Sequence, residues 1–449
     1  MARTLIRELA RLAGAQTGVR TGAAADPAET VTVHGWINAL RLQSRMQFVV
    51  VRDHTGLVQV THRRGGDGDP VEAALERLTP ESAVKITGTV VANPIVKLGG
   101  LEIRPERVEI VALAEAGLPI DEHSGPEHRL DWRFLDLRRP ERQLVLAVQT
   151  TVEQAMREVA AEEGFTELHS PKLMGAPSES GAEVFRVGYF DRTAYLAQSP
   201  QFYKQLAIAG GIDRVFEIGP VFRAEPSYTS RHATEFTGVD VEIAWIEDVE
   251  EVMAFEERML HRVLSRVTER HGEAIRELLG VEPVVPALPF PRVTMAEALA
   301  RLRATGWDPE GVAEDLDPEG ERRLAALVAE EHGHAFVFVT DFPASVRPFY
   351  HHRRAADPSV TASFDLLWQG LEITTGAQRE HRYEVLRAQA TEKGMALEPL
   401  ASYLDCFRYG TPPHGGFGLG LGRVLMVLLG LGSIRDAGFL FRGPNRLTP

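Results

Sequence analysis

The chain has few of the features that would place it in a membrane or in an oxidising compartment. Its single cysteine, Cys406, excludes an internal disulfide and a zinc site built from cysteines. It has no run of about 18 apolar residues, so no membrane span is expected. Residues 1–18 lack the continuous apolar segment of a secretory signal. We therefore expect a protein of the reducing cytoplasm.

Net positive charge is also lacking, since the formal net charge is −14. Such a charge is unfavourable for binding nucleic acid, but its distribution is uneven. Residues 1–66 contain nine arginines and four acidic residues, a net charge of +5, which leaves −19 for the remainder. This asymmetry indicates a small basic domain that meets a polyanion, although on charge alone compositional chance is an equally good explanation.

The 449 residues exceed one typical core and divide into three parts. Five short β-type segments with glycine and aspartate at their turns predict an all-β OB-fold barrel over residues 1–112. Residues 113–138, rich in glycine, proline and charge, are predicted to be a hinge. Residues 139–449 form the main domain, with a helical insertion at about 260–335 between two halves of one site.

The predicted barrel has an exposed aromatic candidate for base stacking. Barrels of this type bind single-stranded nucleic acid on aromatic rings beside arginines. Phe48, flanked by Arg41 and Arg45, fits that pattern, and Trp36 is a second candidate. For Trp36, a position in the barrel core is at least as good an interpretation.

Charges of both signs are concentrated in residues 222–242, a stretch that otherwise has β character. Apolar residues from Val239 onward alternate with Asp240 and Glu242, so the two carboxylates point to one side of a sheet. Arg223 follows a second β-type run, and a polar loop joins the two. Such a pair of strands suits a site for a zwitterionic, phosphorylated ligand; a salt-bridged surface hairpin is the alternative.

Two further segments contain residues suited to phosphate or metal. The glycine-rich residues 415–423 precede an apolar helical run, so the backbone can approach an anion at the helix start, where Arg423 adds a phosphate-binding fork. Their spacing is neither that of a P-loop nor that of a Rossmann motif. On a predicted hairpin, Asp365, Glu372 and Thr375 supply the hard oxygen ligands that suit Mg²⁺ shared with phosphates.

Three segments resemble the signature motifs of class II aminoacyl-tRNA synthetases: GFTELHSPKL at 164–173, FRAE…RH…EF…D.E from residue 222, and GGFGLGLGR at 415–423. Over its whole length the chain resembles the aspartyl-tRNA synthetases of the archaeal and eukaryotic type, in subclass IIb. The resemblance implies an α+β fold, with an antiparallel sheet flanked by helices behind an OB-fold anticodon-binding barrel. It also implies a homodimer formed through the first motif.

The resemblance assigns roles by position. For ATP it implies Arg223, Glu225, Arg231, His232, Phe236, Glu372, Gly420 and Arg423, with Arg223 and Arg423 as the catalytic cations. For aspartate it implies Glu179, Ser199, Gln201, Lys204, Asp240, Thr375 and Arg379. For Mg²⁺ it implies Asp365, Glu372 and Thr375. For tRNA the candidates are Arg41, Arg45, Phe48 and Gln59.

The implied reaction is the ATP-dependent ligation of L-aspartate to tRNA through an aspartyl-adenylate, with ATP and Mg²⁺ as cofactors. Two cations around the side-chain pocket, Lys204 and Arg379, favour aspartate over neutral asparagine. Whether asparagine tRNA is charged as well as aspartate tRNA is left open by the loops of the barrel.

Several positions depart from the family pattern. Leu367 and Gln369 replace a glutamate and an arginine, Ser227 and Tyr228 stand where asparagine is more usual, and Gly422 replaces a glutamate beside the third-motif arginine. These changes motivate the hypothesis of a specialised duplicate with altered inhibitor sensitivity or tRNA choice.

Two other function classes compete with the ligase. The first is an ATP-dependent amidating enzyme built on the same catalytic domain, against which the barrel argues. The second is a catalytically silent RNA-binding paralogue, against which the intact Arg223, Glu372 and Arg423 argue.

Overall fold

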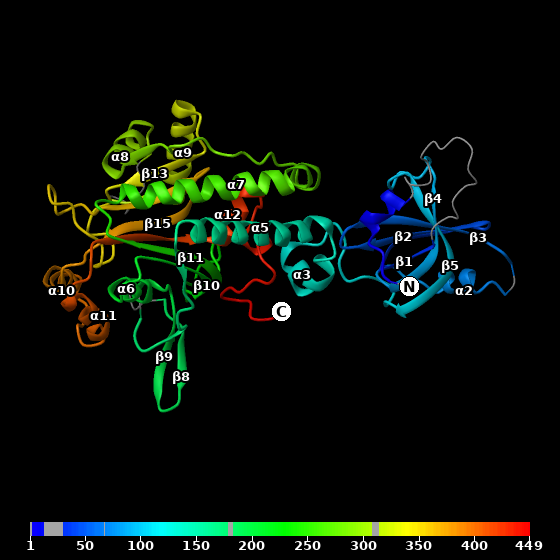
Figure 1. Cartoon of the computed structure of the whole chain (residues 1–449), viewed down its shortest axis with the longest axis horizontal. Helices are drawn as coiled ribbons and strands as arrows, with labels where there is room; N and C mark the ends of the chain where they lie inside the picture. Colours follow the sequence, from blue (N-terminus) through cyan, green and yellow to red (C-terminus); the bar gives the residue numbers. More distant parts are fainter. Residues whose placement is uncertain (1, 13–29, 67, 178–182, 308–313) are drawn as a thin grey trace. The chain divides into compact units, whose positions relative to one another are not determined.

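The computed structural model describes residues 2–12, 30–66, 68–177, 183–307 and 314–449. The chain forms two compact units, Met1–Pro140 and Glu141–Pro449 (Figure 1). No helix among the described residues is long and apolar enough to cross a membrane.

The first unit is the closed five-stranded barrel that the sequence predicts, with strand order β1-β2-β3-β5-β4. Its strands are β1 (Thr30–Leu42), β2 (Met46–Asp53), β3 (Gly56–Arg63), β4 (Ala83–Ala92) and β5 (Leu101–Ala112). In β2 the side chains of Val49 and Val51 are fully buried inside the barrel, whereas Phe48 and Val50 alternate with them on its outside. The alternation that predicts a half-buried strand therefore also decides which side chains can meet a ligand.

A short helix, α2 (Pro70–Glu76), follows β3 and is anchored to it through its N-cap. The Asp69 carboxylate accepts hydrogen bonds from the backbone N–H groups of Val71 and Glu72, and its other oxygen lies 3.0 Å from Nε2 of His62 on β3. The segment predicted as a hinge contains two short helices, α3 (Pro126–Asp131) and α4 (Arg133–Asp136).

The second unit is built on an eight-stranded sheet of order β12-β13-β14-β15-β16-β11-β10-β6, antiparallel except at the β12–β13 and β10–β6 pairs. The strands are β6 (Thr166–Glu167), β10 (Arg214–Phe222), β11 (Glu235–Ala244), β12 (Arg292–Thr294), β13 (Phe336–Thr340), β14 (Ser363–Trp368), β15 (Leu371–Arg379) and β16 (His414–Gly420). A separate small sheet has order β7-β9-β8, from β7 (Leu173–Met174), β8 (Arg186–Tyr189) and β9 (Arg192–Leu196).

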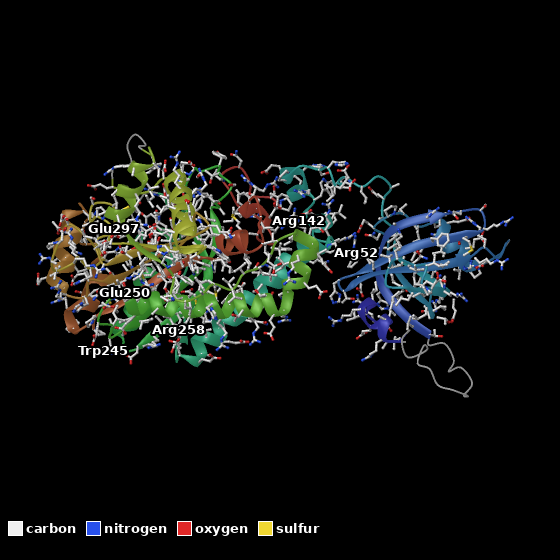
Figure 2. The ribbon with its side chains drawn as sticks, turned by 90° about the horizontal axis from the view of Figure 1, so that it is seen from above. Arg52, Arg142, Trp245, Glu250, Arg258 and Glu297 are labelled. Atoms are coloured by element: carbon white, nitrogen blue, oxygen red, sulfur yellow. The ribbon has the colours of Figure 1, made fainter. Side chains whose placement is uncertain are left out.

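Two long helices, α5 (Pro140–Glu162) and α7 (Glu250–Leu279), cover the apolar face of the large sheet (Figure 1). Val239, Val241 and Phe417 from the central strands pack into the same core as these helices. The outer side of α7 carries charged groups such as Glu250 and Arg258, which are labelled in Figure 2. The helix is thus apolar toward the sheet and polar toward solvent, the ordinary pattern of a covering helix.

The opposite face of the sheet is polar and is only partly covered by shorter helices. These helices are α6 (Gln201–Ala209), α10 (Tyr383–Glu392) and α11 (Ala401–Asp405). Helix α12 (Leu421–Leu428) follows β16 directly, and its apolar side chains belong to the core that α5 and α7 share with the sheet. The segment at about 260–335, predicted to be a mostly helical insertion, is helical over most of its described length but also contains a strand. Alongside α8 (Met295–Ala304) and α9 (Pro318–His332) it contributes β12 to the large sheet, because the apolar side chains of Val293 and Val339 share a core with both helices.

Candidate active site

A cavity of about 360 Å³ opens on the polar face of the large sheet, between β10, β11, β15, β16 and the start of α6. Residues predicted from the sequence to bind ATP or aspartate make up much of its wall: Ser199, Gln201, Arg223, Glu225, Arg231, His232, Phe236, Asp240, Glu372, Thr375, Arg379, Gly420 and Arg423. Lys204 and Asp365 lie behind the wall rather than in it. Glu179 lies outside the described residues.

One end of the cavity is cationic, as an anion site requires. Arg223, just beyond the end of β10, has its guanidinium carbon 5.5 Å from the centre of the Phe236 ring, so the two planar groups share one wall. Burial lowers the pKa of His232, and the nearby Arg423 and Arg231 lower it further, despite the opposing charge of Glu225. At neutral pH we therefore expect a neutral imidazole among the arginines.

The glycine-rich strand β16 brings its backbone against the floor of the cavity. A Cβ on Gly416 would lie 1.9 Å from the carbonyl oxygen of Val241, so no side chain fits there. Gly420 is the N-cap of α12, whose positive end therefore opens at the cavity.

Arg423, in the first turn of α12, is oriented by Glu372. Its Nη1 donates to the Glu372 carbonyl oxygen at 2.8 Å and lies 3.5 Å from the Glu372 carboxylate. Gly422, the departure beside it, packs against Ile434 in the space where a Cβ would meet that side chain at 3.1 Å. The carbonyl and carboxylate of Glu372 thus hold the arginine without a glutamate at position 422.

The candidate metal site depends on a β-bulge between β14 and β15. Leu366 pairs with Thr374 and Leu367 with Glu372, which leaves Ile373 as the extra residue. Strict alternation would put Glu372 and Thr375 on opposite faces of the sheet, and the bulge brings both to the cavity, where the Thr375 hydroxyl donates to Glu372 at 3.2 Å.

Asp365 stands opposite Thr375 in the β14–β15 ladder and is largely buried. One of its oxygens accepts a 2.6 Å hydrogen bond from Arg347, and the other has no hydrogen-bond partner among the described residues. Burial, together with the nearby Glu372, raises the pKa of Asp365 to about 6, despite the charge of Arg347. Converging carboxylate and hydroxyl oxygens, with one buried oxygen unpartnered, fit a hard divalent cation such as Mg²⁺.

The end of the cavity that the sequence predicts to bind the amino acid borders a buried cluster of four charged side chains. Lys204 Nζ lies 3.0 Å from the Asp240 carboxylate and 3.3 Å from that of Glu242, and it also donates to the carbonyl oxygens of Val241 and Phe417. Arg379 Nε donates to Glu242 at 2.9 Å. Although burial alone would raise the pKa of Glu242, Arg379 and Lys204 hold it below its ordinary value.

Of this cluster, Asp240 and Arg379 line the cavity, whereas Lys204 does not line it and gives its hydrogen bonds to protein groups. Arg379 also approaches Nε2 of His351 at 3.2 Å, and burial beside that arginine keeps the pKa of His351 well below its ordinary value. The neutral ring can then accept a hydrogen bond from Arg379 and fix the direction of its guanidinium.

Sequence reasoning missed Arg347, His351 and Glu321. Arg347 and His351 lie between β13 and β14 in a segment without a recognisable motif, and only the fold brings them to the cavity. Glu321 belongs to α9, far from the motifs, yet its carboxylate accepts a 2.8 Å hydrogen bond from Arg231. Burial raises the pKa of Glu321 to about 7, against the opposing effect of Arg231.

The outer surface of the barrel brings the predicted RNA-binding residues close together. Arg41 pairs with Phe48, Phe48 pairs with Thr61, and the Gln59 amide donates to the Thr61 hydroxyl at 3.0 Å. Arg41 and Arg45 are exposed. Trp36 is half-buried outside the core, with the Arg138 guanidinium 5.0 Å from its ring centre.

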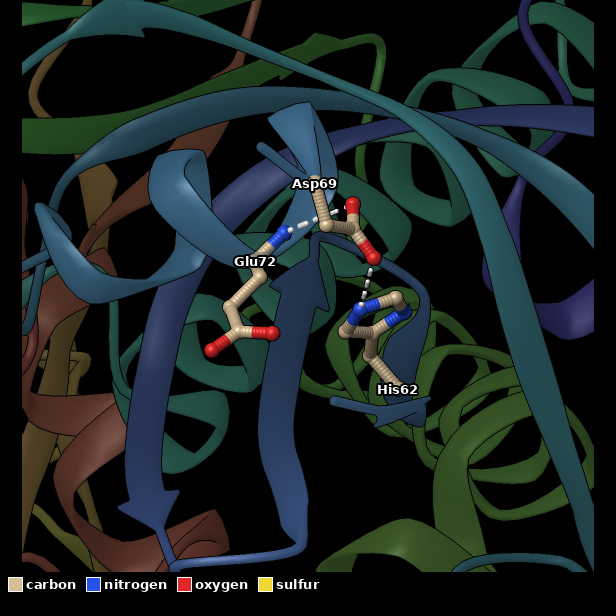
Figure 3. A group of neighbouring side chains, drawn as sticks. All are labelled: His62, Asp69 and Glu72. Carbon is tan, nitrogen blue, oxygen red and sulfur yellow. Dashed lines mark hydrogen bonds and ion pairs between the residues drawn. The ribbon is translucent and has the colours of Figure 1, made fainter. Parts of the chain in front are cut away.

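One group of potential metal ligands occurs on the barrel, among the described residues: His62, Asp69 and Glu72 (Figure 3). Each already has a protein partner. Asp69 caps α2 and meets His62, while the Glu72 carboxylate accepts a hydrogen bond from Arg64 at 2.6 Å. Because Glu72 is already paired with Arg64, we interpret the three residues as polar contacts that hold α2 against β3 and not as a metal site.

The chain is thus a two-domain protein, with an OB-type barrel followed by a mostly antiparallel sheet whose polar face holds a cavity lined by arginines, carboxylates and glycines. The chain belongs to the class II tRNA synthetases (D, K and N), whose family model matches residues 125–441. Residues 31–111 match the OB-fold nucleic acid binding domain.

Similar proteins fall within this family. The chain is 43% identical to an aspartate–tRNA(Asp/Asn) ligase of Aeropyrum pernix, over 93% of this chain and 95% of that one. It is 40% identical to an aspartate–tRNA(Asp) ligase of Thermococcus kodakarensis, over 94% and 96%.

Solved structures of tRNA synthetases also superpose on this chain. The aspartyl-tRNA synthetase of Entamoeba histolytica superposes with a TM-score of 0.87 at 31% identity, covering 100% of this chain and 93% of that one. The asparaginyl-tRNA synthetase of Pyrococcus horikoshii with asparaginyl-adenylate gives 0.86 at 33%, covering 94% and 96%. Since enzymes for both amino acids superpose equally well, the choice of amino acid has to be argued from the site.

Proposed function

We propose that this protein is an aspartate–tRNA ligase that forms aspartyl-adenylate from L-aspartate and ATP and transfers the aspartyl group to tRNA in the cytoplasm. The observation that carries this proposal is Arg379, which lines the amino-acid end of the cavity and is fixed by Glu242 and His351. A guanidinium fixed in this way can donate a charge-assisted hydrogen bond from its remaining N–H to a side-chain carboxylate. An asparagine amide would present an NH₂ donor to that guanidinium where aspartate presents a second acceptor oxygen.

In the proposed mechanism the α-carboxylate of aspartate attacks the α-phosphate of ATP, a step that needs no general base. Arg223 and Arg423 stabilise the charge that develops on the phosphates, and Phe236 stacks on the adenine. Asp240, Ser199 and Gln201 meet the α-ammonium group. Catalysis is then a matter of positioning and charge neutralisation.

Mg²⁺ would be held by Glu372 and Thr375, with Asp365 behind them, and would neutralise phosphate charge when bound. Lys204 is proposed to act on aspartate through Asp240, because its own hydrogen bonds all go to protein groups. On the barrel, Phe48 with Arg41, Arg45 and Gln59 would bind anticodon bases. A homodimer through the segment that resembles the first motif completes the proposal.

The test is ATP–pyrophosphate exchange without tRNA, measured with aspartate and with asparagine. We expect exchange with aspartate alone. Exchange with asparagine would overturn the assignment of Arg379, and no exchange with either would favour the silent RNA-binding paralogue. Charging of aspartate and asparagine tRNAs by the same preparation then settles which tRNA is accepted.

A further inference from the structure

The hairpin formed by β8 and β9 (Figure 1) ends in a pair of exposed aromatic residues, Tyr189 and Phe190. Phe190 is 93% exposed and Tyr189 is 39% exposed. The two rings meet edge to face, with centres 4.9 Å apart. Neither ring contributes to a core, so folding alone does not explain why large aromatic side chains stand there.

The backbone at the tip adds a second observation. Tyr189 pairs with Arg192, so Phe190 and Asp191 form a two-residue hairpin loop. Phe190 has φ +52°, a left-handed conformation that glycine or asparagine adopts far more easily in such loops. A bulky residue held in this conformation costs stability, and residues of this kind concentrate at functional positions.

The charges around the rings match a polyanion. Arg186 and Arg192 flank the tip, are exposed, and have no ion pair with any residue that the structure describes. They stand out because the chain beyond residue 66 has a net charge of −19. Exposed aromatic rings beside unpaired arginines are the elements with which proteins bind single-stranded nucleic acid.

The base of the hairpin is attached to the rim of the cavity. Strand β9 continues through Ala197, whose carbonyl accepts a hydrogen bond from Phe222 N–H, directly to Ser199 in the cavity wall. On the other side, Ala224 N–H donates to the carbonyl of Glu183, just before β8. At about 3.3 Å per residue, the nine residues from Phe190 to Ser199 span at most about 30 Å, a distance that a short stretch of unpaired nucleotides can bridge.

We propose that the Tyr189–Phe190 tip is a stacking platform for the single-stranded 3′ end of the RNA substrate, whose terminal hydroxyl would be placed in the cavity. The inference rests on the proposed function. A base would stack on the Phe190 ring, with Arg186 and Arg192 at the neighbouring phosphates. The tip would bind without reading sequence, since every base offers a flat face.

The decisive variants are Phe190→Gly and Phe190→Asn, because both residues suit the left-handed turn and preserve folding. We expect the melting temperature to rise, the KM for tRNA to increase about tenfold, and aspartate-dependent pyrophosphate exchange to stay at the parent rate. Phe190→Tyr, which keeps a stacking ring, should leave the KM for tRNA unchanged. Tyr409→Ala removes an aromatic ring that is 84% exposed elsewhere and serves as the matched control.

Binding of a labelled single-stranded RNA ending in CCA, followed by fluorescence anisotropy, separates this inference from the proposed function. Weaker binding by Phe190→Gly supports the platform even where exchange with aspartate fails in the parent protein. Equal RNA binding and an equal KM for tRNA in parent and variant would overturn it. So would a shift of Phe190→Gly from dimer to monomer in sedimentation, because the tip would then be an interface between two copies of the chain.

Discussion

The barrel and the large sheet use basic side chains in opposite ways. On the barrel, Arg41 and Arg45 lie exposed beside Phe48, where they are free to meet a ligand. At the large sheet, Lys204 of α6 and Arg379 of β15 are 3% exposed and are bound to Glu242. A cation on the barrel surface is therefore expected to affect binding alone, whereas a cation in the buried cluster should affect both binding and stability.

The largest expected effect is that of Lys204→Met, which removes a buried cation. It leaves Glu242 with Arg379 and takes from Asp240 its ion-pair partner in the cluster. We expect aspartate-dependent exchange to fall by about 100- to 1,000-fold. Unfolding by urea should show a loss of about 3–5 kcal/mol, the usual cost of breaking a buried pair.

Lys85→Met on the barrel is the matched control for this prediction. Lys85 forms a 3.2 Å pair with Glu109, but its side chain is 40% exposed, so its loss should cost less than about 1 kcal/mol. Equal destabilisation by the two variants would break the distinction between buried and exposed cations.

The next effect concerns Glu256, a carboxyl on α7 beneath the apolar face of the sheet. Burial raises the pKa of Glu256 from 4.5 to about 8, and Glu257 and Asp365 act in the same direction. Between pH 4.5 and 8 the folded chain keeps a proton that the unfolded chain releases, so stability falls as pH rises. Glu256→Gln lacks this proton linkage and should be the more stable protein at pH 8 by a few kcal/mol, on the order of 1.4 kcal/mol per pKa unit.

The measurement for Glu256 is urea unfolding of parent and variant at pH 5 and at pH 8, with Glu250→Gln as the control from the exposed side of α7. The advantage of Glu256→Gln should be smaller at pH 5. An advantage that does not change with pH would mean that the carboxyl is ionised in the folded protein.

A smaller effect is expected for Phe48→Ala on the barrel. Loss of one stacked base should raise the KM for tRNA about tenfold, while pyrophosphate exchange and the melting temperature stay unchanged. Val50→Ala, on the same outer face of β2, is the control. An unchanged KM for tRNA would remove Phe48 from the anticodon site.

The smallest effect is expected for Glu321→Gln. The Glu321 carboxylate holds Arg231 at the end of the cavity proposed to bind the phosphates, and an amide in its place keeps the shape but loses the charge. We expect the KM for ATP to rise about fivefold with little change in kcat, consistent with about 1 kcal/mol for the lost charge. A lower KM would show instead that Glu321 competes with the phosphates for Arg231.

Much of this architecture could be predicted from local pattern. The five β-type segments between residues 30 and 112 form the closed barrel, and Val239 and Val241 face the core while Asp240 faces the cavity. These predictions succeed because the two-residue period of a strand couples each side chain directly to a face of the sheet.

The helical pattern between residues 260 and 335 was a poorer guide. It contains no sign of β12, which is only three residues long and joins the sheet through long-range pairing with β13. Two of the departures from the family pattern also became clear only from the structure. Leu367 is buried in the core that α8 and α9 share with β13, and Gln369 has φ +51° in the turn between β14 and β15.

The sequence by itself determined the barrel, the polar strand β11, the glycine-rich strand β16 beside the cavity and the family to which the chain belongs. Each of these can be recognised from local periodicity or from a contiguous motif. Only the tertiary structure decided the rest. A bulge at Ile373 turns Glu372 and Thr375 to the same side, and α9 brings Glu321 to Arg231. Saturation of its hydrogen bonds by the protein keeps Lys204 behind the cavity wall. Each of these three features depends on contacts between residues distant in sequence or on an irregular strand register. A short window of the chain predicts neither long-range contacts nor a shifted register.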